Sequence, residues 1–440
     1  MIIGLDALDP RVLFAGHGSA FPRLSSLARR GTSGRLRSTI PPITVPAWVT
    51  MTSGMDPGEL GIYGFHGRIP CTYDTRLHDS TDVRAPRIWD LAARSGLRSI
   101  VLGVPLTYPP PGDMDGVLAG DPLMPCSASE HSCPGNLKTR IEERFGPFVP
   151  DVEGFRNVDR AVLADRILAV SDQHFRIAEW LAQGLEWDLF MMVDMGIDRF
   201  QHAFFRHLDP GHPTWRSLVP DRAGREAASS FLAAIDEHAG RLFDIAGPET
   251  TVIVVSDHGA RSLEGGFAVN EWLEREGYLH RDGSGIDWSR TSAWGEGGYV
   301  ARMHLNIEGR EPCGIVRQGR EGPLLSDIAS RLESLAGPDA KPMRNRCLRP
   351  RDVYRSVRGL PPDLLVELGG LAYRSIGSFP GTIFTTGNDT GADDANHDHE
   401  GIFVMAGPGI DPGGRMDVRI EDVADLAARI LGCATPPSRG

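Results

Sequence analysis

Residues 188–202 read DLFMMVDMGIDRFQH. An unbroken apolar run between two aspartates is typical of a strand buried on both faces of a parallel sheet. Residues 158–185 precede this run and place their apolar side chains at helical spacing. Asp194, Asp198 and His202 follow the predicted strand, the last two at positions four residues apart. Because ligands of open α/β sheets bind beyond the carboxyl ends of the strands, these polar side chains are candidates for a functional site.

The same order, a helix followed by a strand, recurs through the first part of the chain. A helix over residues 87–94 leads into a strand over residues 99–104. A second helix, over residues 225–246, leads into the apolar residues 252–255, and the chain opens with an apolar strand over residues 2–5. This alternation is typical of βαβ units. We therefore predict an α/β fold with a mostly parallel central sheet flanked by helices.

The alternation stops after Gly259. Residues 262–395 combine short helical patterns with loops rich in glycine and proline, and we predict that they form an inserted cap region. Within the cap, the pattern predicts helices over 269–276 and 324–335 and a strand over 302–307. The core domain would then comprise residues 1–261 and 396–440, with a last strand over 401–406 and a last helix over 420–431.

Residues 105–150 are rich in Pro, Gly, Ser and Cys, which predicts a long loop. Loops of this length border active sites in many enzymes, and a plain surface loop is the alternative. Cys126 and Cys133 lie in this stretch at a separation that would allow a disulfide. The six cysteines contain no CxxC pair, however, and free thiols in a reducing compartment are the simpler expectation.

The composition is that of a soluble globular protein, with 41% hydrophobic and 24% charged residues. A net charge of −12 without a basic stripe argues against a nucleic-acid polymer as partner. No apolar run reaches the length of a membrane span, and the first residues lack the basic and apolar regions of a signal peptide. We therefore expect a cytoplasmic protein that does not bind membranes. The sequence does not distinguish a monomer from a homo-oligomer.

Further carboxylates and imidazoles stand where strands are predicted to end or begin. Asp6 ends the first strand, Asp257 and His258 follow residues 252–255, and His397 precedes the last strand. Together with Asp198 and His202 they could converge on one site at the edge of the sheet. Mixed carboxylate and imidazole ligands suit zinc or manganese better than an ion that prefers oxygen alone. The sequence therefore predicts a metallohydrolase.

A nucleophile for this site is suggested by residues 40–54, which read IPPITVPAWVTMTSG. Prolines stiffen the backbone around Thr44, and a helix is predicted to begin close to Pro46. Thr44 would then lie near a helix N-terminus, where free amides stabilise negative charge. From chemistry alone, the hydroxyl that attacks phosphorus remains open among five residues: Thr39, Thr44, Thr50, Thr52 and Ser53.

An ordered set of motifs resembles the alkaline phosphatase superfamily and, within it, the type I phosphodiesterase/nucleotide pyrophosphatase branch. The motifs are Gly4-Leu5-Asp6, Thr44-Val45-Pro46, Asp198 with His202, Ser256-Asp257-His258-Gly259, and His397-Asp398-His399-Glu400-Gly401-Ile402. The resemblance implies an alkaline-phosphatase-like core with an inserted cap. It also implies two divalent metal ions, preferably zinc, with manganese as the alternative.

The resemblance also implies a role for each residue. Asp198, His202 and His397 would hold one metal, whereas Asp6, Asp257 and His258 would hold the other with Thr44 as a further ligand and the nucleophile. His399 competes with His397 for the last position. The family pattern of a histidine, two residues, an acid and then Gly-Ile favours His397, since Glu400-Gly401-Ile402 completes that pattern. Asp194 and Asp9 are expected to have supporting roles.

The implied activity is cleavage of phosphodiester or nucleotide pyrophosphate bonds in a small-molecule phosphate ester or nucleotide. The second metal would lower the pKa of the Thr44 hydroxyl, and a phosphothreonine intermediate would form and be hydrolysed. A phosphomonoesterase or phosphomutase of the same superfamily is the alternative within enzymes. A non-catalytic phosphate-binding protein is the alternative outside them, although all seven expected positions are filled.

One stretch departs from the family pattern. Nucleotide pyrophosphatases carry an asparagine that contacts a phosphate oxygen shortly after the nucleophile helix, and Phe65 stands at the corresponding place. His66 or Arg68 could supply the missing contact, and both could equally be ordinary loop residues. Among the aromatic residues, packing is the expected role of Trp48, while Trp294 and Tyr299 in the cap could also contact a leaving group.

Overall fold

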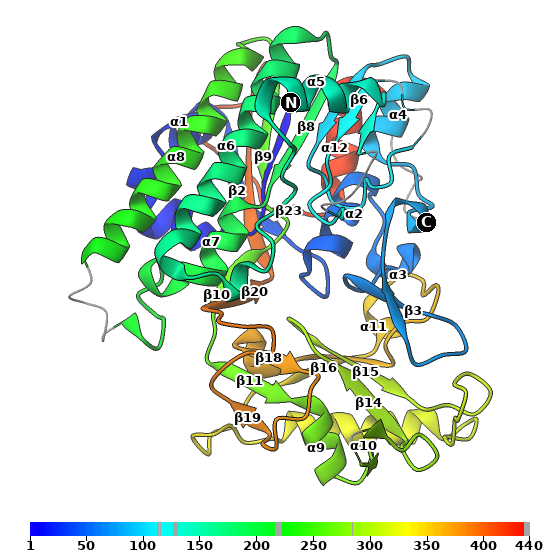
Figure 1. Ribbon diagram of the computed structural model, residues 1–440. Helices are drawn as coiled ribbons and strands as arrows, with labels where there is room; N and C mark the ends of the chain where they lie inside the picture. The colour runs from blue at the N-terminus through cyan, green and yellow to red at the C-terminus, as the bar shows by residue number, and fades with distance from the viewer. Residues whose placement is uncertain (112–113, 115, 126–130, 216–221, 284, 435–440) are drawn as a thin grey trace. The chain divides into compact units, whose positions relative to one another are not determined.

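The computed structural model describes residues 1–111, 114, 116–125, 131–215, 222–283 and 285–434. The chain forms two compact units (Figure 1). Unit 1 consists of Met1–Asp56, His78–Ala260 and Asp398–Gly440, and unit 2 consists of Pro57–Leu77 and Arg261–His397. The boundaries near residues 260 and 397 lie close to those predicted for the cap. The sequence assigned Pro57–Leu77 to the core, however, whereas this segment belongs to unit 2.

Unit 1 is built on a ten-stranded sheet. Its strands are β1 (Ile2–Leu5), β2 (Thr32–Arg37), β5 (Ser99–Leu102), β6 (Gly116–Ala119), β7 (Ser132–Cys133), β8 (Leu189–Asp194), β9 (Val252–Val255), β21 (Glu400–Ala406), β22 (Gly414–Arg415) and β23 (Val418–Arg419). Their order is β22-β2-β21-β9-β1-β8-β5-β6-β7, and β23 pairs with β2. The five neighbours from β9 to β6 run parallel, whereas β21 is antiparallel to both β9 and β2. The predicted mostly parallel sheet is therefore confirmed.

Helices cover both faces of this sheet (Figure 1). They are α1 (Pro22–Arg30), α2 (Thr44–Ser53), α4 (Ile88–Arg94), α5 (Asn136–Phe145), α6 (Arg160–Gly184), α7 (Gly196–Phe204), α8 (Arg222–Ala246) and α12 (Asp422–Leu431). Apolar residues of α2, α4 and α12 pack on one face around Trp48, Trp89 and Val423. Helices α1, α6 and α8 pack together over the other face. None of the described helices is long and apolar enough to cross a lipid bilayer.

The three central strands bring their carboxyl ends to one edge of the sheet. β1, β8 and β9 are buried along their whole length, as expected for apolar strands covered on both faces. Leu5 lies opposite Asp194, and Gly4 lies opposite Val255. Gly4 also leaves room for α2, because a Cβ there would lie 2.3 Å from the Trp48 ring. This register places the residues after each strand close together.

The segment predicted as a long loop, residues 105–150, contains regular structure instead. β6 extends the sheet as a parallel strand, β7 follows it as an antiparallel edge strand, and α5 contacts both of them. The prediction of a loop was therefore wrong, because short strands that join an existing edge need little local pattern of their own. Cys133, in β7, carries a free thiol. Cys126 lies outside the described residues.

Unit 2 has smaller sheets and its own apolar core. Its strands are β3 (His66–Arg68), β4 (Thr75–Leu77), β11 (Gly265–Ala268), β12 (Arg281–Asp282), β13 (Gly285–Ile286), β14 (Ala293–Glu296), β15 (Ala301–Leu305), β16 (Arg346–Leu348), β17 (Leu364–Glu367), β18 (Tyr373–Ile376) and β19 (Phe384–Thr385). Its helices are α3 (Pro57–Leu60), α9 (Val269–Arg275), α10 (Glu321–Glu333) and α11 (Pro350–Val353). The chain passes between the units in β10 (Gly259–Ser262) and β20 (Ala395–Asp398), which pair with each other.

Long-range packing explains why Pro57–Leu77 belongs to unit 2. β3 and β4 form a hairpin, and Tyr73 in its turn packs against the core that contains Trp294 and Leu305. The Tyr73 ring stacks on Trp288 with centroids 3.6 Å apart. Tyr73 and its partners are more than 200 positions apart in the sequence, so no local pattern could have predicted this assignment.

Candidate metal and nucleophile site

Helix α2 places a hydroxyl at its first position. Ile43 is extended, with φ −121° and ψ 133°, and the helix begins with Thr44. Pro46 is tolerated in the first turn because the amide that it lacks would have no helical partner there. The helix ends at Gly54, whose φ of 74° lets its amide donate a hydrogen bond to the Thr50 carbonyl and close the last turn. Thr44 is buried and lies at the positive end of the helix dipole.

The structure separates Thr44 from the other hydroxyl candidates. Thr39 donates to the Pro41 carbonyl, Thr52 to the Trp48 carbonyl and Ser53 to the Val49 carbonyl. The Thr50 hydroxyl is buried without a hydrogen-bond partner. Only Thr44, of these five, contacts one of the predicted ligands. Its Oγ1 lies 3.3 Å from His258 Nε2.

Two carboxylates surround the same imidazole nitrogen. His258 Nε2 lies 3.6 Å from Asp6 Oδ1 and 3.3 Å from Asp257 Oδ2. Asp6, Asp257 and His258 are completely buried, and one ligand atom of each lies within 4.8 Å of the others. The residues that the sequence assigned to one metal are thus assembled in one cluster, with Thr44 beside it.

The other ring nitrogen of His258 determines the tautomer of the imidazole. Nδ1 lies 3.0 Å from the Gly259 carbonyl oxygen, which can only accept. Nδ1 therefore carries the proton, and Nε2 presents its lone pair to the cluster. Burial lowers the pKa of His258 to about 4, so the imidazole is neutral at neutral pH. A neutral imidazole with a free lone pair is the form that binds a metal ion.

Burial and neighbouring negative charge dominate the electrostatics of the carboxylates in the cluster. Burial raises the pKa of Asp6 well above its usual range, and the negative charge of Asp198 adds to the effect. Burial and the charge of Asp6 raise the pKa of Asp257 in the same way. Asp6 Oδ1 and Asp257 Oδ2 are buried without hydrogen-bond partners, and both face His258 Nε2. Two orphaned carboxylate oxygens beside an imidazole lone pair fit a divalent cation.

A second group of ligands meets at α7 and β20. Ligand atoms of Asp198, His258 and His397 lie within 4.8 Å of one another, and all three residues are buried. His202 lies one turn after Asp198 in α7, with its Nε2 3.3 Å from Asp198 Oδ1. The sequence grouped Asp198 with His202 and His397. In the structure His258 belongs to both clusters, and His202 is the direct neighbour of Asp198.

Arg199 and Gln201 hold α7 in place. The Arg199 guanidinium pairs with Asp151, with nitrogen–oxygen distances of 2.7 and 2.9 Å, and also donates to Asp198 Oδ2. Gln201 donates to the Ala7 carbonyl in the loop after β1. α7 is thereby tied to the loop that carries Asp6.

Asp194 and Asp9 have the supporting positions that the sequence suggested. Asp194 accepts the Ser171 hydroxyl and the Gly196 amide, at 3.1 and 3.0 Å. It therefore fixes the start of α7, and its backbone carbonyl accepts the Asp6 amide.

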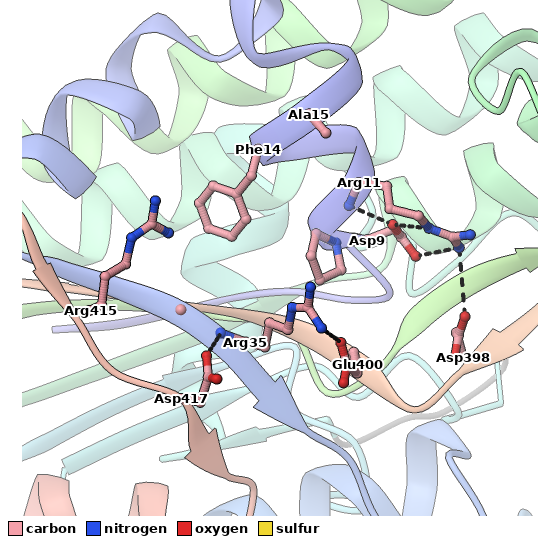
Figure 2. Close-up of a pocket in the computed structure, with 11 residues that line it drawn as sticks. Asp9, Arg11, Phe14, Ala15, Arg35, Asp398, Glu400, Arg415 and Asp417 are labelled. Carbon is pink, nitrogen blue, oxygen red and sulfur yellow. Dashed lines mark hydrogen bonds and ion pairs between the residues drawn. The ribbon is translucent and has the colours of Figure 1, made fainter.

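Asp9 and Arg11 join the loops that carry the ligands (Figure 2). Asp9 accepts Arg11 Nε and Nη2, both at 2.9 Å, and the Ala260 amide at 3.1 Å. Arg11 Nη2 also donates to the Ala260 carbonyl and lies 3.6 Å from Asp398 Oδ2. Because Ala260 and Asp398 are close neighbours of His258 and His397 in the sequence, this network ties the segments after β1 and β9 to the end of β20.

The network lines a pocket of about 410 Å³ in unit 1. Its lining contains three arginines and four carboxylates, so its charge does not favour an anion: Arg11, Arg35 and Arg415, with Asp9, Asp398, Glu400 and Asp417. Figure 2 shows Arg35 paired with Glu400, at 2.8 Å. We therefore interpret the pocket as the outer surface of the network.

The suggested phosphate contacts, Phe65, His66 and Arg68, all lie in unit 2. The Arg68 side chain is buried, pairs with Glu311 at 2.8 Å and lies 5.0 Å from the centroid of the Trp294 ring. His66 is exposed, and its carbonyl accepts a bond from Arg302. The Phe65 ring lies 6.5 Å from the Tyr299 ring. A contact of any of these residues with a substrate stays a prediction.

Trp48 has a role that sequence reasoning missed. Its indole Nε1 donates to Asp6 Oδ2 over 2.6 Å, and the whole side chain is buried. Trp48 lies four residues after Thr44, so both occupy the same face of α2. That spacing was the available signal, because a buried indole N–H needs an acceptor and Asp6 was already a candidate ligand.

Comparisons with known proteins found a matching family and similar folds. A sequence model of the type I phosphodiesterase/nucleotide pyrophosphatase family matches residues 1–367. No functionally curated protein matches the sequence. Among solved structures, human ectonucleotide pyrophosphatase/phosphodiesterase 5 is similar at a TM-score of 0.59 and 15% identity, over 100% of this chain and 96% of its own. An inactive variant of the murine protein in complex with AMP is similar at a TM-score of 0.59 and 13% identity, over 100% of this chain and 96% of its own.

Phosphonoacetate hydrolase from Sinorhizobium meliloti 1021, solved in complex with phosphonoformate, is similar at a TM-score of 0.61 and 17% identity. The match covers 98% of this chain and 95% of the hydrolase. At such identities, the likeness to these three structures shows a shared fold. The alkaline-phosphatase-like fold predicted from the motifs is therefore confirmed.

The bond between Trp48 and Asp6 can be tested by Trp48→Phe, which keeps a ring but removes the N–H group. Loss of a group that orients a ligand typically weakens metal binding by about 10–100-fold. We expect that loss in a competitive zinc titration. Trp89→Phe is the matched control, since Trp89 is buried in the same core and its ring packs under the Arg87 guanidinium. Equal zinc affinity in Trp48→Phe and wild type would contradict the assigned role.

The buried carboxylates predict how the metal-free protein responds to pH. The folded pKa values of Asp6 and Asp257 lie above the value in the unfolded chain, which is about 4. As pH rises above about 4, the unfolded chain releases its protons first, so the free energy of unfolding falls. With a chelator present, we expect the melting temperature to fall over this range more steeply in wild type than in Asp6→Asn/Asp257→Asn. Equal slopes in the two proteins would contradict the prediction.

Proposed function

Because the chain belongs to the type I phosphodiesterase/nucleotide pyrophosphatase family and is a hydrolase, we propose that it cleaves phosphodiester or nucleotide pyrophosphate bonds through a phosphothreonine on Thr44. The observation that carries this proposal is the position of the Thr44 hydroxyl. It lies at the start of α2, 3.3 Å from His258 Nε2 and beside the orphaned oxygens of Asp6 and Asp257. A hydroxyl in this environment is suited to act as a nucleophile.

The residues of the clusters would hold two divalent metal ions. We assign one to Asp6, Asp257, His258 and Thr44, and the other to Asp198, His202 and His397. Three imidazoles among six charged or imidazole ligands support zinc, with manganese as the alternative. Bound divalent ions supply a lower pKa for a hydroxyl and a positive charge for the oxygens around phosphorus. His258 and Asp6 are oriented for this task by the Gly259 carbonyl and the Trp48 indole.

The chain's own residues divide the reaction into two steps. Thr44 Oγ1 loses its proton and forms a bond to phosphorus, while the bond from phosphorus to the leaving oxygen breaks and that oxygen takes up a proton. A water molecule then attacks the same phosphorus, the bond to Thr44 breaks, and the hydroxyl is restored. The net reaction adds one water across the ester bond. During both steps the N-terminus of α2 favours negative charge on the phosphoryl group.

The substrate that we propose is a small phosphate ester or a nucleotide. The AMP complex of the murine neighbour supports a nucleotide, because that protein holds one in a shared fold. The net charge of −12 supports a small ligand over a nucleic-acid polymer, since a polyanion would be repelled. The Phe65 side chain has no polar group, so it cannot donate a hydrogen bond to a phosphate oxygen.

The proposed bond specificity can be tested by comparing initial rates on bis-p-nitrophenyl phosphate and p-nitrophenyl phosphate, after loading with zinc or manganese. We expect faster cleavage of the diester, because the family acts on phosphodiester bonds. A preference for the monoester would replace the proposal by a phosphomonoesterase or phosphomutase. A metal-loaded protein without activity on either ester would support a binding role instead.

Thr44→Ala should remove turnover and leave metal binding in place, because the imidazoles and carboxylates remain. Loss of a catalytic nucleophile lowers the rate by on the order of 10⁴-fold or more. Thr44→Ser keeps a hydroxyl at the same position and should retain part of the activity. The metal content of both variants, measured by elemental analysis, separates a chemical defect from an empty site. Full activity of Thr44→Ala would exclude Thr44 as the nucleophile.

A further inference from the structure

An aromatic ring of unit 2 lies flat against the predicted ligand His397. His397 is in β20 and is buried. The centroids of the Tyr299 and His397 rings are 3.5 Å apart, and the planes are inclined by 22°. A stack this close prevents the imidazole from turning about its last side-chain bond. The stack contacts the face of the imidazole, whereas both ring nitrogens lie on its edge.

Tyr299 is itself held by a buried cation. The Arg374 guanidinium carbon lies 4.4 Å from the centroid of the Tyr299 ring, within the range of a cation–π contact. Arg374 pairs with Asp393 at 2.7 Å, and the two side chains are 6% and 0% exposed. Arg374 Nε has no hydrogen-bond partner. Burying a guanidinium with an unsatisfied N–H is unfavourable. The contact with the face of the Tyr299 ring offsets part of this cost for Arg374.

The backbone beside both rings is also fixed. Asn396 precedes His397 and is fully buried. Its side-chain amide donates to the Tyr299 carbonyl at 3.0 Å and to the Leu371 carbonyl at 2.9 Å. Tyr299 and His397 are therefore connected twice, through their rings and through Asn396. The hydrogen bond from Asn396 to the Tyr299 carbonyl thus fixes the backbone next to the stacked rings.

We propose that Tyr299 is a positioning residue that sets the orientation of the His397 imidazole for metal binding, with Arg374 holding the tyrosine ring. This inference rests on the proposed metal site. Groups behind a ligand orient it and so raise its affinity for the metal, most often through a hydrogen bond to the second imidazole nitrogen. Here the stack provides the orientation through the plane of the ring. The aromatic ring is therefore the required feature, and the tyrosine hydroxyl is dispensable.

Cobalt(II) binding to the chelator-treated full-length protein tests this inference, because its visible absorption reports ligand geometry independently of activity. Tyr299→Leu removes the ring. It should lower the affinity for one of the two cobalt ions by about 10–100-fold and change the visible absorption of that ion, while the other ion binds as in wild type. Tyr299→Phe should match wild type in both respects. Tyr354→Leu is the matched control: Tyr354 is equally buried in unit 2, and its ring packs on Tyr63 with centroids 5.7 Å apart.

A second variant keeps the test decisive if Tyr299→Leu does not fold. Arg374→Gln/Asp393→Asn removes both buried charges together and leaves the tyrosine ring in place. It should lower the affinity for the same cobalt ion, by a smaller factor than Tyr299→Leu does. Wild-type affinity for both ions in folded Tyr299→Leu, or in the double variant if only that one folds, would overturn the inference. An equal loss in Tyr299→Phe would overturn it too, because the hydroxyl would then be the required group.

The same titration separates this inference from the proposed function. If wild type and Tyr354→Leu bind two cobalt ions and Tyr299→Leu does as well, only the role of Tyr299 fails. If wild type binds no cobalt, the proposed metal site fails and the inference fails with it. Selective loss of one ion in Tyr299→Leu would support both.

Discussion

The arrangement of unit 1 around its site depends on concentrating negative charge where water cannot reach it. Asp6, Asp257 and Asp198 are all buried, the charge of Asp198 raises the pKa of Asp6, and the charges of Asp6 and Asp198 raise the pKa of Asp257. Two unit charges 4 Å apart repel by about 4 kcal/mol at an effective dielectric constant of 20. Such a group persists only if protons or cations neutralise it. Because the neighbouring imidazoles offer lone pairs, cations are the better explanation, and metal binding is then coupled to the stability of the folded chain.

Hydrogen bonds between the loops that carry the ligands oppose the repulsion between the carboxylates. The Ser256 hydroxyl donates to the Leu8 carbonyl and accepts the Ile402 amide, both at 2.8 Å, and so joins the ends of β1, β9 and β21. Asp9 and Arg11 join the same loops from the outside. Trp48 joins α2 to Asp6 from the sheet face. The bonds of Ser256, Asp9 and Arg11 use side chains outside the proposed ligand set, so they hold the loops together whether or not the ligands repel one another.

The sequence predicted the parts of this arrangement that depend on local pattern. The strands before Asp6, Asp194 and Asp257 are apolar runs between polar residues, and the long helices before β8 and β9 have clear periodicity. The motifs then selected Thr44 from several hydroxyls, which composition and spacing alone could not do. The structure supports that selection, since Thr39, Thr52 and Ser53 are bonded to backbone carbonyls.

The parts that the sequence did not predict depend on contacts between distant residues. β6 and β7 are short and gain their order from the edge that they join, and Pro57–Leu77 is placed by the packing of Tyr73. The stack of Tyr299 on His397 joins residues about 100 positions apart, and neither residue signals the other locally. Supporting residues are harder to find than ligands for this reason. A ligand must be an acid or an imidazole, whereas a support is defined only by what it touches.

The chemistry of the site finally depends on one lone pair. Nδ1 of His258 keeps its proton because a carbonyl accepts it, and the pKa of about 4 keeps the ring neutral. Nε2 can then either accept a hydrogen bond from Thr44, as it does here, or bind a cation, but it cannot do both with the same electrons. Metal binding at His258 would therefore release the Thr44 hydroxyl from this hydrogen bond. The oxygen that loses this hydrogen bond is also the one best placed to attack phosphorus, so binding the cation and freeing the nucleophile would be the same event.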